Sequence, residues 1–428
     1  MFNYTNNKDV IKILGGTKLN GTINIEGAKN SALPLIATSI LANSKMILNN
    51  MPNLSDIYNM VDILRELNIK CDFQNNTLKI DNSELNNFSA SYELVSKMRA
   101  SVLILGPLLA KYSKAEVPMP GGCSIGSRPV DMHIEALKTM GANIEIQHGN
   151  IVATTNGKLK GAEIYFKHIS VGATENILMA STLAQGKTKI INAACEPEIV
   201  DLANLLNKMG AKITGAGSNV IEVEGVDNLC GVEYSVMPDR IETGSYALAT
   251  LATGGNVILQ NTSSSILGDF KKFFEQAGGQ IIDLPNNSLQ IISSGMINAV
   301  DISTNPYPEF PTDLQAPWMA TLCFASDKSF IKENIFENRF THVPELIKMG
   351  ANIVMRDNNS AIIYGVQNLE GAKVNSTDLR ASFALIIAGL CAKGETTVLG
   401  LQHLDRGYVN VVDKLKSLGA NINRGVNI

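Results

Sequence analysis

The sequence predicts an α/β protein of two domains, built from six copies of one unit of about 70 residues. Two observations predict this: a short glycine-containing phrase recurs at regular intervals, and an apolar helix rich in small residues accompanies each copy. The chain of 428 residues also exceeds what one ordinary core contains, which indicates more than one domain. The copies of the phrase are Met-Gly-Ala-Asn-Ile at 140–144, Met-Gly-Ala-Lys-Ile at 209–213, Ala-Gly-Gly-Gln-Ile at 277–281, Met-Gly-Ala-Asn-Ile at 349–353, Leu-Gly-Ala-Asn-Ile at 418–422 and a degenerate Leu-Asn-Ile-Lys-Cys at 67–71.

The recurring phrase follows an amphipathic helix and begins a strand. Its glycine is expected to adopt the left-handed conformation that ends a helix, because glycine enters that conformation without a steric penalty. This requirement explains why the glycine keeps the same place in five of the six copies.

The second helix of each unit is apolar on all sides, so it must be buried, while the amphipathic helix should lie outside over a sheet. A short Gly, Ser or Lys break and then a β-branched strand follow each apolar helix. One unit therefore reads as helix, strand, helix, Gly-Ala turn, strand, strand. The expected apolar helices cover 29–42, 99–110, 173–184, 242–253, 313–324 and 379–390.

Six units predict two domains of three units each. We expect domain I to contain residues 1–28 and 238–428, and domain II to contain residues 29–237. The N-terminal strand pair at 13–27 has no helices before it and should complete the last unit, so the chain crosses between domains twice. A cleft between two such domains is where a ligand is expected to bind.

Composition narrows the class of protein. Apolar residues make up 45% of the chain and charged residues 18%, which is typical of a packed globular protein. The net charge of −4 argues against a nucleic-acid binder. The N-terminus lacks the pattern of a signal peptide, and the longest apolar stretch, 381–392, is shorter than the roughly 20 residues that span a bilayer. We expect a soluble cytoplasmic protein with no membrane or nucleic-acid partner.

A glycine-rich loop at 120–131 interrupts the apolar rhythm and is expected to act as a mobile lid in domain II. Pro129 suits the first position of a following helix, so Arg128 should lie at a helix N-terminus, where an anion is favoured. The same field should raise the thiolate fraction of Cys123. The alternative is a glycine turn with an inert, buried Cys123. The apolar face of the expected helix is Val130, Ile134, Leu137 and Met140.

The other cysteines fit inert core positions. No CxxC spacing suggests a zinc site or a disulfide framework. Cys195 lies beside a turn, and the rest lie among apolar neighbours: Cys71, Cys230, Cys323 and Cys391.

Cations recur at matching points of the repeat and indicate a site for a polyanion. Four of them precede or open an apolar helix: Lys29, Arg99, Arg240 and Arg380. Arg339 and Arg406 hold comparable places in other segments. Any one of them alone would be read as a solvated surface residue. Carboxylates interleave with them and could be helix caps or partners of arginine: Asp131, Asp239, Asp313, Asp378 and Asp405.

Several chemistries leave no signature in the sequence. There is no Walker loop, GxGxxG, HExxH or calcium loop, and the five histidines lack metal-ligand spacing. We therefore expect no metal and no cofactor, and an anionic substrate handled by Arg and Lys.

The motifs together resemble the enolpyruvyl transferases, in particular those that act on UDP-N-acetylglucosamine. They extend over essentially the whole chain: GAKNSALP, MRAS, PGGCSIGSRPVD, SVGATENI, EPEIVD, PDRIETG, FPTDLQA, FENRF, HVPEL, DLRAS and DRGY. The resemblance implies a two-domain inside-out α/β barrel with six βαβαββ-type repeats. It also implies transfer of the enolpyruvyl group of phosphoenolpyruvate to the sugar 3-hydroxyl, the first committed step of peptidoglycan synthesis, on which cell shape and division depend.

The resemblance also implies roles for individual residues. Lys29, Arg128 and Arg406 would hold phosphoenolpyruvate, and Arg99 would help hold the substrates. Asp313 would accept the proton of the sugar 3-hydroxyl, and Cys123 would be the general acid and the target of fosfomycin. The UDP-sugar would contact Asn30, Arg128, Pro129, Val130, Asp131, Met132, Asp313 and Ile335, and the cations Arg339 and Arg380 complete the expected substrate-binding set.

Some questions stay open at the level of the sequence. The contact to the diphosphate near 167–170 is not assigned, because Lys167 and His168 both qualify. The shikimate 3-phosphate transferases share the fold but are not expected to have the Cys123 loop. A silent paralogue that binds the nucleotide sugar, and a cysteine hydrolase with His133 as base, are two further readings. The sequence does not determine the oligomeric state, and a homo-oligomer is one of the options.

Overall fold

The structure is a computed structural model that describes residues 9–119, 126 and 130–426. Of these, unit 1 contains 9–26, 126 and 238–426, and unit 2 contains 27–119 and 130–237. The chain passes between the units after Glu26 and after Met237. The boundaries predicted from the sequence were 28/29 and 237/238.

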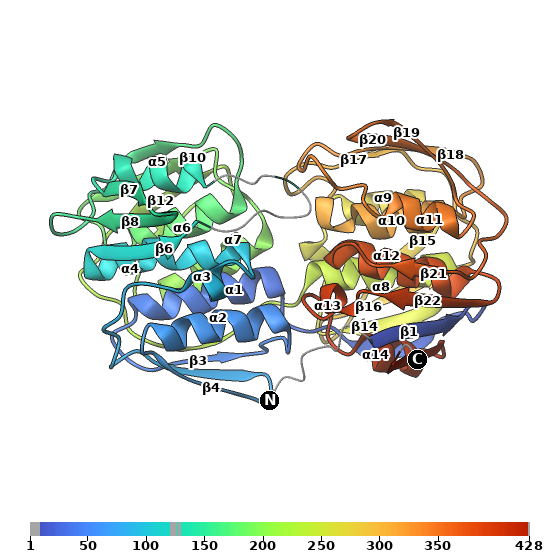
Figure 1. Ribbon diagram of the computed structural model, residues 1–428, viewed down its shortest axis with the longest axis horizontal. Helices are drawn as coiled ribbons and strands as arrows, with labels where there is room; N and C mark the ends of the chain where they lie inside the picture. Colours follow the sequence, from blue (N-terminus) through green and yellow to red (C-terminus); the bar gives the residue numbers. More distant parts are fainter. Residues whose placement is uncertain (1–8, 120–125, 127–129, 427–428) are drawn as a thin grey trace. The chain divides into compact units, whose positions relative to one another are not determined.

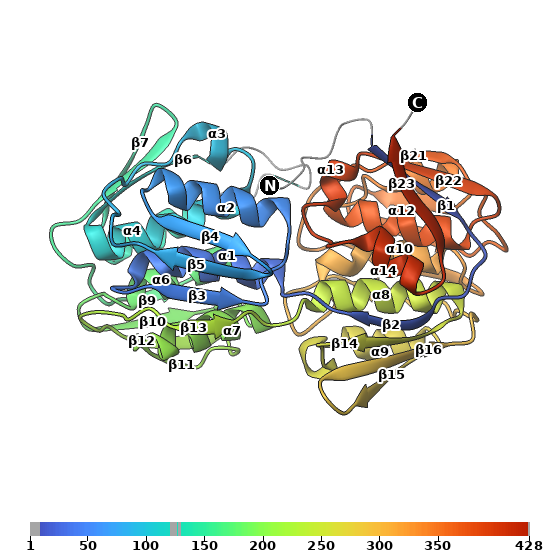
Figure 2. The same cartoon turned by 90° about the horizontal axis from the view of Figure 1, so that it is seen from below.

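Unit 1 encloses three apolar helices, which pack on one another in its interior (Figures 1 and 2). They are α8 (Arg240–Thr253), α10 (Gln315–Leu322) and α12 (Leu379–Cys391). In α12 every residue from Arg380 to Leu390 is buried, as the all-round apolar pattern predicted. Shorter helices accompany them: η3 (Ser264–Ile266), α9 (Phe270–Gln276), η4 (Thr312–Leu314), α11 (Val343–Lys348), α13 (Leu401–Leu404) and α14 (Val411–Ser417).

Unit 2 repeats this plan with its own buried helices. They are α1 (Lys29–Thr38), α4 (Leu105–Tyr112) with the preceding η2 (Arg99–Ile104), and α6 (Val171–Ser181). The six predicted apolar helices are thereby confirmed as buried helices. The amphipathic helices α2 (Ser55–Glu66), α5 (Asp131–Thr139) and α7 (Pro197–Lys208) each bury one face; η1 (Ser39–Leu41) and α3 (Tyr92–Val95) are short.

The sheets of the described residues share one topology. In each four-stranded sheet an edge strand pairs parallel with its neighbour, and the remaining strands are antiparallel. In unit 2 the orders are β13 (Glu233–Ser235)-β3 (Met46–Asn49)-β5 (Thr77–Asp81)-β4 (Lys70–Gln74), β6 (Lys114–Pro118)-β8 (Asn150–Thr154)-β7 (Asn143–Gln147) and β9 (Glu163–Tyr165)-β10 (Lys187–Ile191)-β12 (Val220–Glu224)-β11 (Lys212–Thr214). In the three-stranded sheet, an isolated parallel bridge between Ser89 and Glu116 stands where the edge strand would be.

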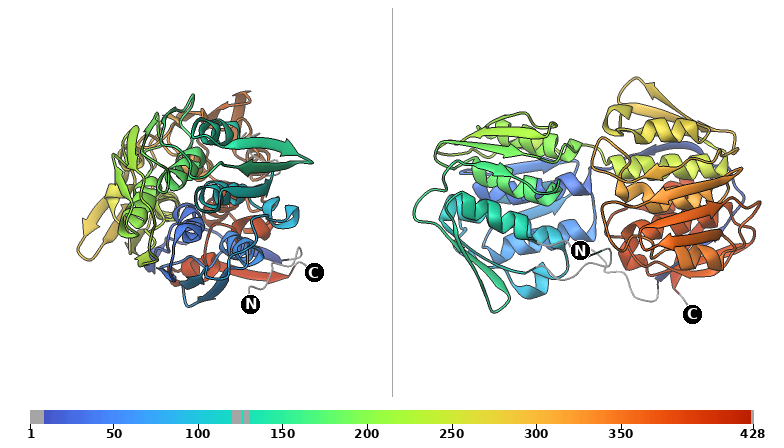
Figure 3. Two further views of the ribbon diagram at one scale, coloured as in Figure 1. Left: turned by 90° about the vertical axis from the view of Figure 1, so that its left-hand side faces the viewer. Right: turned by 90° about the horizontal axis from the view of Figure 1, so that it is seen from above.

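In the three sheets of unit 1 the strands from β14 to β23 run from yellow through orange to red, and the N-terminal strands β1 and β2 are blue (Figure 3). Their orders are β2 (Asn20–Asn24)-β14 (Asn256–Gln260)-β16 (Ser288–Ser293)-β15 (Gly279–Leu284), β17 (Ile302–Ser303)-β18 (Lys328–Lys332)-β20 (Ser360–Tyr364)-β19 (Asn352–Asp357) and β21 (Lys373–Asn375)-β22 (Glu395–Leu399)-β1 (Asp9–Leu14)-β23 (Asn421–Val426).

The two N-terminal strands separate, which corrects the expectation that the pair completes the last unit. β1 does lie between β22 and β23 of the last unit, but β2 pairs parallel with β14 in another sheet. Gly15 and Gly16 make this change of sheet possible. A Cβ at Gly15 would lie 2.3 Å from the carbonyl oxygen of Ala392, and Gly16 has φ +93°.

The Gly-Ala turns have the predicted backbone conformation. The glycine has positive φ in all five copies: 94° at Gly141, 110° at Gly210, 100° at Gly278, 94° at Gly350 and 94° at Gly419. In the degenerate copy Asn68 takes the same place with φ 64°, because asparagine tolerates this region better than other non-glycine residues.

We predict that Gly350→Ala lowers the free energy of unfolding by about 1–2 kcal/mol, the cost of a left-handed L-residue. A new Cβ at Gly350 meets nothing within 4 Å, so the backbone alone sets this cost. Gly350→Asn should cost less, by analogy with Asn68. Urea denaturation checks both variants. Equal free energies of unfolding for wild type and Gly350→Ala would contradict the left-handed conformation of Gly350.

Candidate active site

The predicted site residues divide between the two units. Cys123, Arg128 and Pro129 lie outside the described residues. Unit 2 contains Lys29, Asn30, Arg99, Val130, Asp131 and Met132, and unit 1 contains Asp313, Ile335, Arg339, Arg380 and Arg406.

In unit 1, Asp313 joins two buried arginines. Its Oδ1 accepts a hydrogen bond from Arg339 at 2.6 Å, and its Oδ2 accepts one from Arg380 at 2.7 Å. The arginine side chains are only 3% and 4% exposed, whereas that of Asp313 is 24% exposed. The carboxylate is therefore oriented by two guanidinium groups and remains accessible to a ligand.

The packing of two helices brings Asp313 and Arg380 together. Asp313 lies in η4, which leads into α10, and Arg380 is the second residue of α12. Because α10 packs against α12, their N-terminal ends bring Asp313 and Arg380 together. Burial lowers the pKa of Arg380, but Asp313, Tyr408 and Asp239 together outweigh burial and hold that pKa above its usual value.

Aromatic rings support the same guanidinium groups. The Arg380 Cζ lies 5.5 Å from the ring centroid of Tyr408, and the Arg339 Cζ lies 5.4 Å from that of Phe336. Such cation–π contacts stabilise a cation where water is excluded. Neither aromatic residue was among the predicted site residues, because nothing in the linear sequence relates Tyr408 to Arg380.

The other carboxylates of unit 1 that lie near the predicted cations in the sequence have structural partners. Asp239 accepts hydrogen bonds from the N–H groups of Ile241 and Glu242, and so caps α8. Asp378 caps α12 through the N–H groups of Arg380 and Ala381. Asp405 forms a forked ion pair with Arg424 at 2.8 and 2.9 Å. Asp313, by contrast, accepts hydrogen bonds from two buried arginine side chains.

Arg406 lies in the turn after α13. Its charge helps to lower the pKa of His403, although burial is the larger cause. Two residues on, Tyr408 contacts Arg380, so the chain brings Arg406 into the neighbourhood of the Asp313 cluster. Ile335 lies in the loop that follows β18, where its N–H donates to Glu333.

In unit 2, Lys29 is the first residue of α1 and is largely buried. Its Nζ lies 3.3 Å from Asp56 Oδ2, with side chains 11% and 6% exposed. Asn30 follows in the same first turn, and Arg99 opens η2, which packs against α1. Asp56 was not predicted, because a carboxylate in the first turn of α2 reads as an ordinary charge at a helix start.

The start of α5 differs slightly from its predicted pattern. Val130 is buried, Met132 is half-buried and Asp131 is exposed. His133, rather than Ile134, lies on the buried face, where its Nδ1 is 3.0 Å from the side-chain nitrogen of Asn176. This places His133 in the packing of α5 on α6.

The cysteines of the described residues follow the expectation with one correction. Burial raises the pKa of Cys323 and Cys391 to about 12, and burial is also the main cause that raises the pKa of Cys71 to about 12. Cys195 is half-buried, and burial raises its pKa too. Cys230, expected in the core, is exposed. Its N–H bonds to Met209 at the end of α7, on the outer surface of the repeat.

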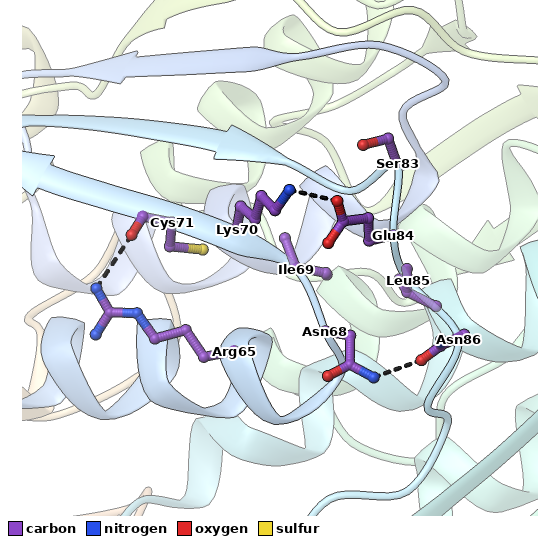
Figure 4. Close-up of a pocket in the computed structure, with 9 residues that line it drawn as sticks. All are labelled: Arg65, Asn68, Ile69, Lys70, Cys71, Ser83, Glu84, Leu85 and Asn86. Atoms are coloured by element: carbon purple, nitrogen blue, oxygen red, sulfur yellow. Dashed lines mark hydrogen bonds and ion pairs between the residues drawn. The ribbon is translucent and has the colours of Figure 1, made fainter.

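A separate surface pocket of about 750 Å³ lies beside β4 (Figure 4). Its polar side chains bond to one another: Lys70 pairs with Glu84, and Asn68 with Asn86. None of the predicted site residues lines it. In the described part of the chain there is no cluster of His, Cys, Asp and Glu suited to a metal ion, and no helix long and apolar enough to cross a membrane.

Comparison with known proteins identifies the family to which the chain belongs. The sequence profile of the family described as EPSP synthase (3-phosphoshikimate 1-carboxyvinyltransferase) matches residues 13–415. The chain belongs to this family of enolpyruvyl transferases. The crystal structure of the enolpyruvyl transferase NikO from Streptomyces tendae has the same fold, with a TM-score of 0.87 and 21% identity over 98% of this chain and 99% of that one.

Closer relatives have a more particular name. The UDP-N-acetylglucosamine 1-carboxyvinyltransferase of Acinetobacter baylyi is 51% identical over 97% of this chain and 99% of its own length. The protein of the same name from Idiomarina loihiensis is also 51% identical, with the same coverage. The predicted two-domain α/β fold and the predicted family are both confirmed.

We predict that Asp313→Ala destabilises unit 1, because it leaves two buried guanidinium groups without their shared carboxylate. The expected loss is about 3 kcal/mol, as for other broken buried pairs. Lys212→Ala is the control: it removes an exposed ion pair with Glu224, and exposed ion pairs contribute little to stability. Thermal unfolding of both variants checks this. A Tm for Asp313→Ala equal to that of Lys212→Ala would show that the arginines do not depend on Asp313.

Proposed function

We propose that this protein transfers the enolpyruvyl group of phosphoenolpyruvate to the 3-hydroxyl of UDP-N-acetylglucosamine, with release of phosphate. The observation that carries the proposal is the 51% identity, over 97% of the chain, to relatives named for this activity. We place the reaction in the cytoplasm as the first committed step of peptidoglycan synthesis, on which cell shape and division depend.

The cations of the site suit these two substrates. Phosphoenolpyruvate carries a phosphate and a carboxylate, which match the fork of an arginine and the point charge of a lysine. In the proposed assignment Lys29, Arg128 and Arg406 hold it, and Arg99 assists. The nucleotide sugar contacts Asn30, Val130, Asp131, Met132, Ile335, Arg339 and Arg380 in addition to Arg128 and Pro129.

Asp313 is proposed to accept the proton of the sugar 3-hydroxyl. The Asp313 side chain is 24% exposed, and Arg339 and Arg380 each donate to one of its oxygens. The two arginines thereby fix the direction of the carboxylate. This combination of orientation and partial exposure supports a role as general base.

Cys123 is proposed to deliver the proton to the methylene carbon of phosphoenolpyruvate. The hydroxyl oxygen adds to the neighbouring carbon, which gives a tetrahedral ketal. Loss of phosphate and of one proton then restores the double bond in the product. The support for Cys123 is the sequence of its loop, in which two glycines precede Cys123 and Arg128 and Pro129 follow it.

Release of inorganic phosphate tests the proposed function. We expect phosphate from phosphoenolpyruvate when UDP-N-acetylglucosamine is present, and none with shikimate 3-phosphate, the acceptor of the alternative. Turnover should persist in excess chelator, because the cations supply the charge stabilisation. Phosphate release with shikimate 3-phosphate alone would select the alternative, and no release with either acceptor would favour a silent paralogue.

We predict that fosfomycin alkylates Cys123, since the cations that dock phosphate would dock its phosphonate against the thiol. Cys123→Ser should be nearly inactive, because a hydroxyl is a weak acid near neutral pH. Cys123→Asp should keep some turnover and escape alkylation. The exposed Cys230 is the competing thiol, so peptide mass spectrometry is best run beside a Cys230→Ser control. An adduct that disappears with Cys230→Ser, or a fully active Cys123→Ser, would remove Cys123 from the mechanism.

A further inference from the structure

One buried carboxylate of unit 2, that of Asp201 in α7, accepts hydrogen bonds from three separate segments. Its Oδ2 accepts from the hydroxyl of Ser31 at 2.5 Å and from the N–H of Met237 at 3.2 Å. Its Oδ1 accepts from the hydroxyl of Tyr234 at 2.7 Å. The side chain thus ties together the start of α1, strand β13 and the last residue of the unit.

A carboxylate suits this arrangement because it accepts at both oxygens, and the N–H of Met237 can only donate. In Asp201→Asn an NH2 group would replace one of the two accepting oxygens. Asp201 makes no ion pair with any described residue, and burial raises its pKa against the effect of the three hydrogen bonds. Among the described residues, only neutral dipoles would stabilise its ionised form, at a cost in desolvation.

The segments that Asp201 joins have functional neighbours. Ser31 lies in the first turn of α1, directly after Lys29 and Asn30. Met237 is the last residue before the chain leaves unit 2, and its carbonyl accepts the N–H of Ala28, the residue that precedes Lys29. The first turn of α1 is therefore fixed from two sides: through Ser31 by Asp201 itself, and through Ala28 by Met237, which Asp201 also holds.

In unit 1 a buried carboxylate also binds the segment that leads to the other unit, but this carboxylate has a cation as partner. The N–H of Glu26, the last residue before the chain leaves unit 1, donates to the buried carboxylate of Glu242 at 2.8 Å. Glu242 is paired with Lys414 at 2.7 Å, so its charge has a cation as partner. Asp201 has no such cation among the described residues, so its main interactions are the hydrogen bonds from Ser31, Tyr234 and Met237.

We propose that Asp201 is a positioning residue for enolpyruvyl transfer. It holds the first turn of α1 in the position that Lys29 and Asn30 need in order to bind the substrates. This inference rests on the proposed function, in which Lys29 binds phosphoenolpyruvate. Asp201 itself touches neither substrate. Its loss should therefore weaken the use of phosphoenolpyruvate more than the fold.

The test compares Asp201→Asn and Ser31→Ala with Asn207→Ala. Ser31→Ala removes only the link to α1 and serves if Asp201→Asn folds poorly. Asn207 lies six residues along the same helix, and its amide makes two hydrogen bonds to Ile213, so its loss loosens α7 away from α1. Each variant is assayed for the KM of phosphoenolpyruvate, for kcat and for Tm. Hydrogen exchange of the peptides around Ser31 and Met237 is followed as a readout independent of turnover.

We expect Asp201→Asn to lower kcat/KM for phosphoenolpyruvate by about 10- to 100-fold, the range that a small displacement of a binding group causes. Ser31→Ala should change it in the same direction by less. Both should speed exchange at the start of α1, and Asn207→Ala should do neither. A lowered Tm with unchanged kcat/KM in Asp201→Asn and Ser31→Ala would overturn the proposal. Wild type without phosphate release would instead overturn the proposed function itself, and the inference with it.

Discussion

The burial of three apolar helices in each unit is the constraint on which the rest of the structure depends. A helix that is apolar on all sides cannot face water on any side, so sheets and amphipathic helices must surround it. α12 illustrates this: eleven consecutive residues, Arg380 to Leu390, are buried. Each large apolar side chain buried there contributes roughly 1.5–3 kcal/mol, so a small unit can exclude water from its centre.

The same burial makes unpaired polar groups at the ends of the inner helices costly, and side chains cap the N-terminal ends of three of these helices. Asp239 caps α8 and Asp378 caps α12, while Ser170 caps α6 by accepting from Ala173. Inside unit 2, Asn176 of α6 accepts from the N–H of Gly106 and donates to the carbonyl of Val102. A Cβ at Gly106 would lie 2.2 Å from the Asn176 oxygen, so this contact requires glycine.

The buried cations of the candidate site also depend on partners that compensate for their charge. Arg339 and Arg380 are nearly inaccessible to water and are stable there because Asp313 and two aromatic rings replace their hydration. Lys29 is stabilised in the same way by Asp56. The fold itself therefore desolvates and orients these groups.

The structure also bears on the competing interpretations. A cysteine hydrolase would need His133 free to act as a base, but this histidine is buried and one ring nitrogen lies 3.0 Å from the amide of Asn176. A shikimate 3-phosphate transferase shares the fold and the family, so the fold cannot separate it from the proposed activity. The distinction rests on the relatives of 51% identity and on the Cys123 loop.

The sequence by itself determined the repeat, the buried helices and the left-handed glycines, because these depend on local periodicity and backbone sterics. It also pointed to Asp313, Arg339 and Arg380 as functional groups. Their mutual pairing, the partner of Lys29 and the triple hydrogen bond of Asp201 were decided by the tertiary structure. These contacts join residues that are 26 to 170 positions apart in the sequence, and a charge pattern along the chain does not encode such pairings. The separation of β1 from β2 was likewise decided by packing, since two glycines permit the turn but only the sheets that receive each strand determine its direction.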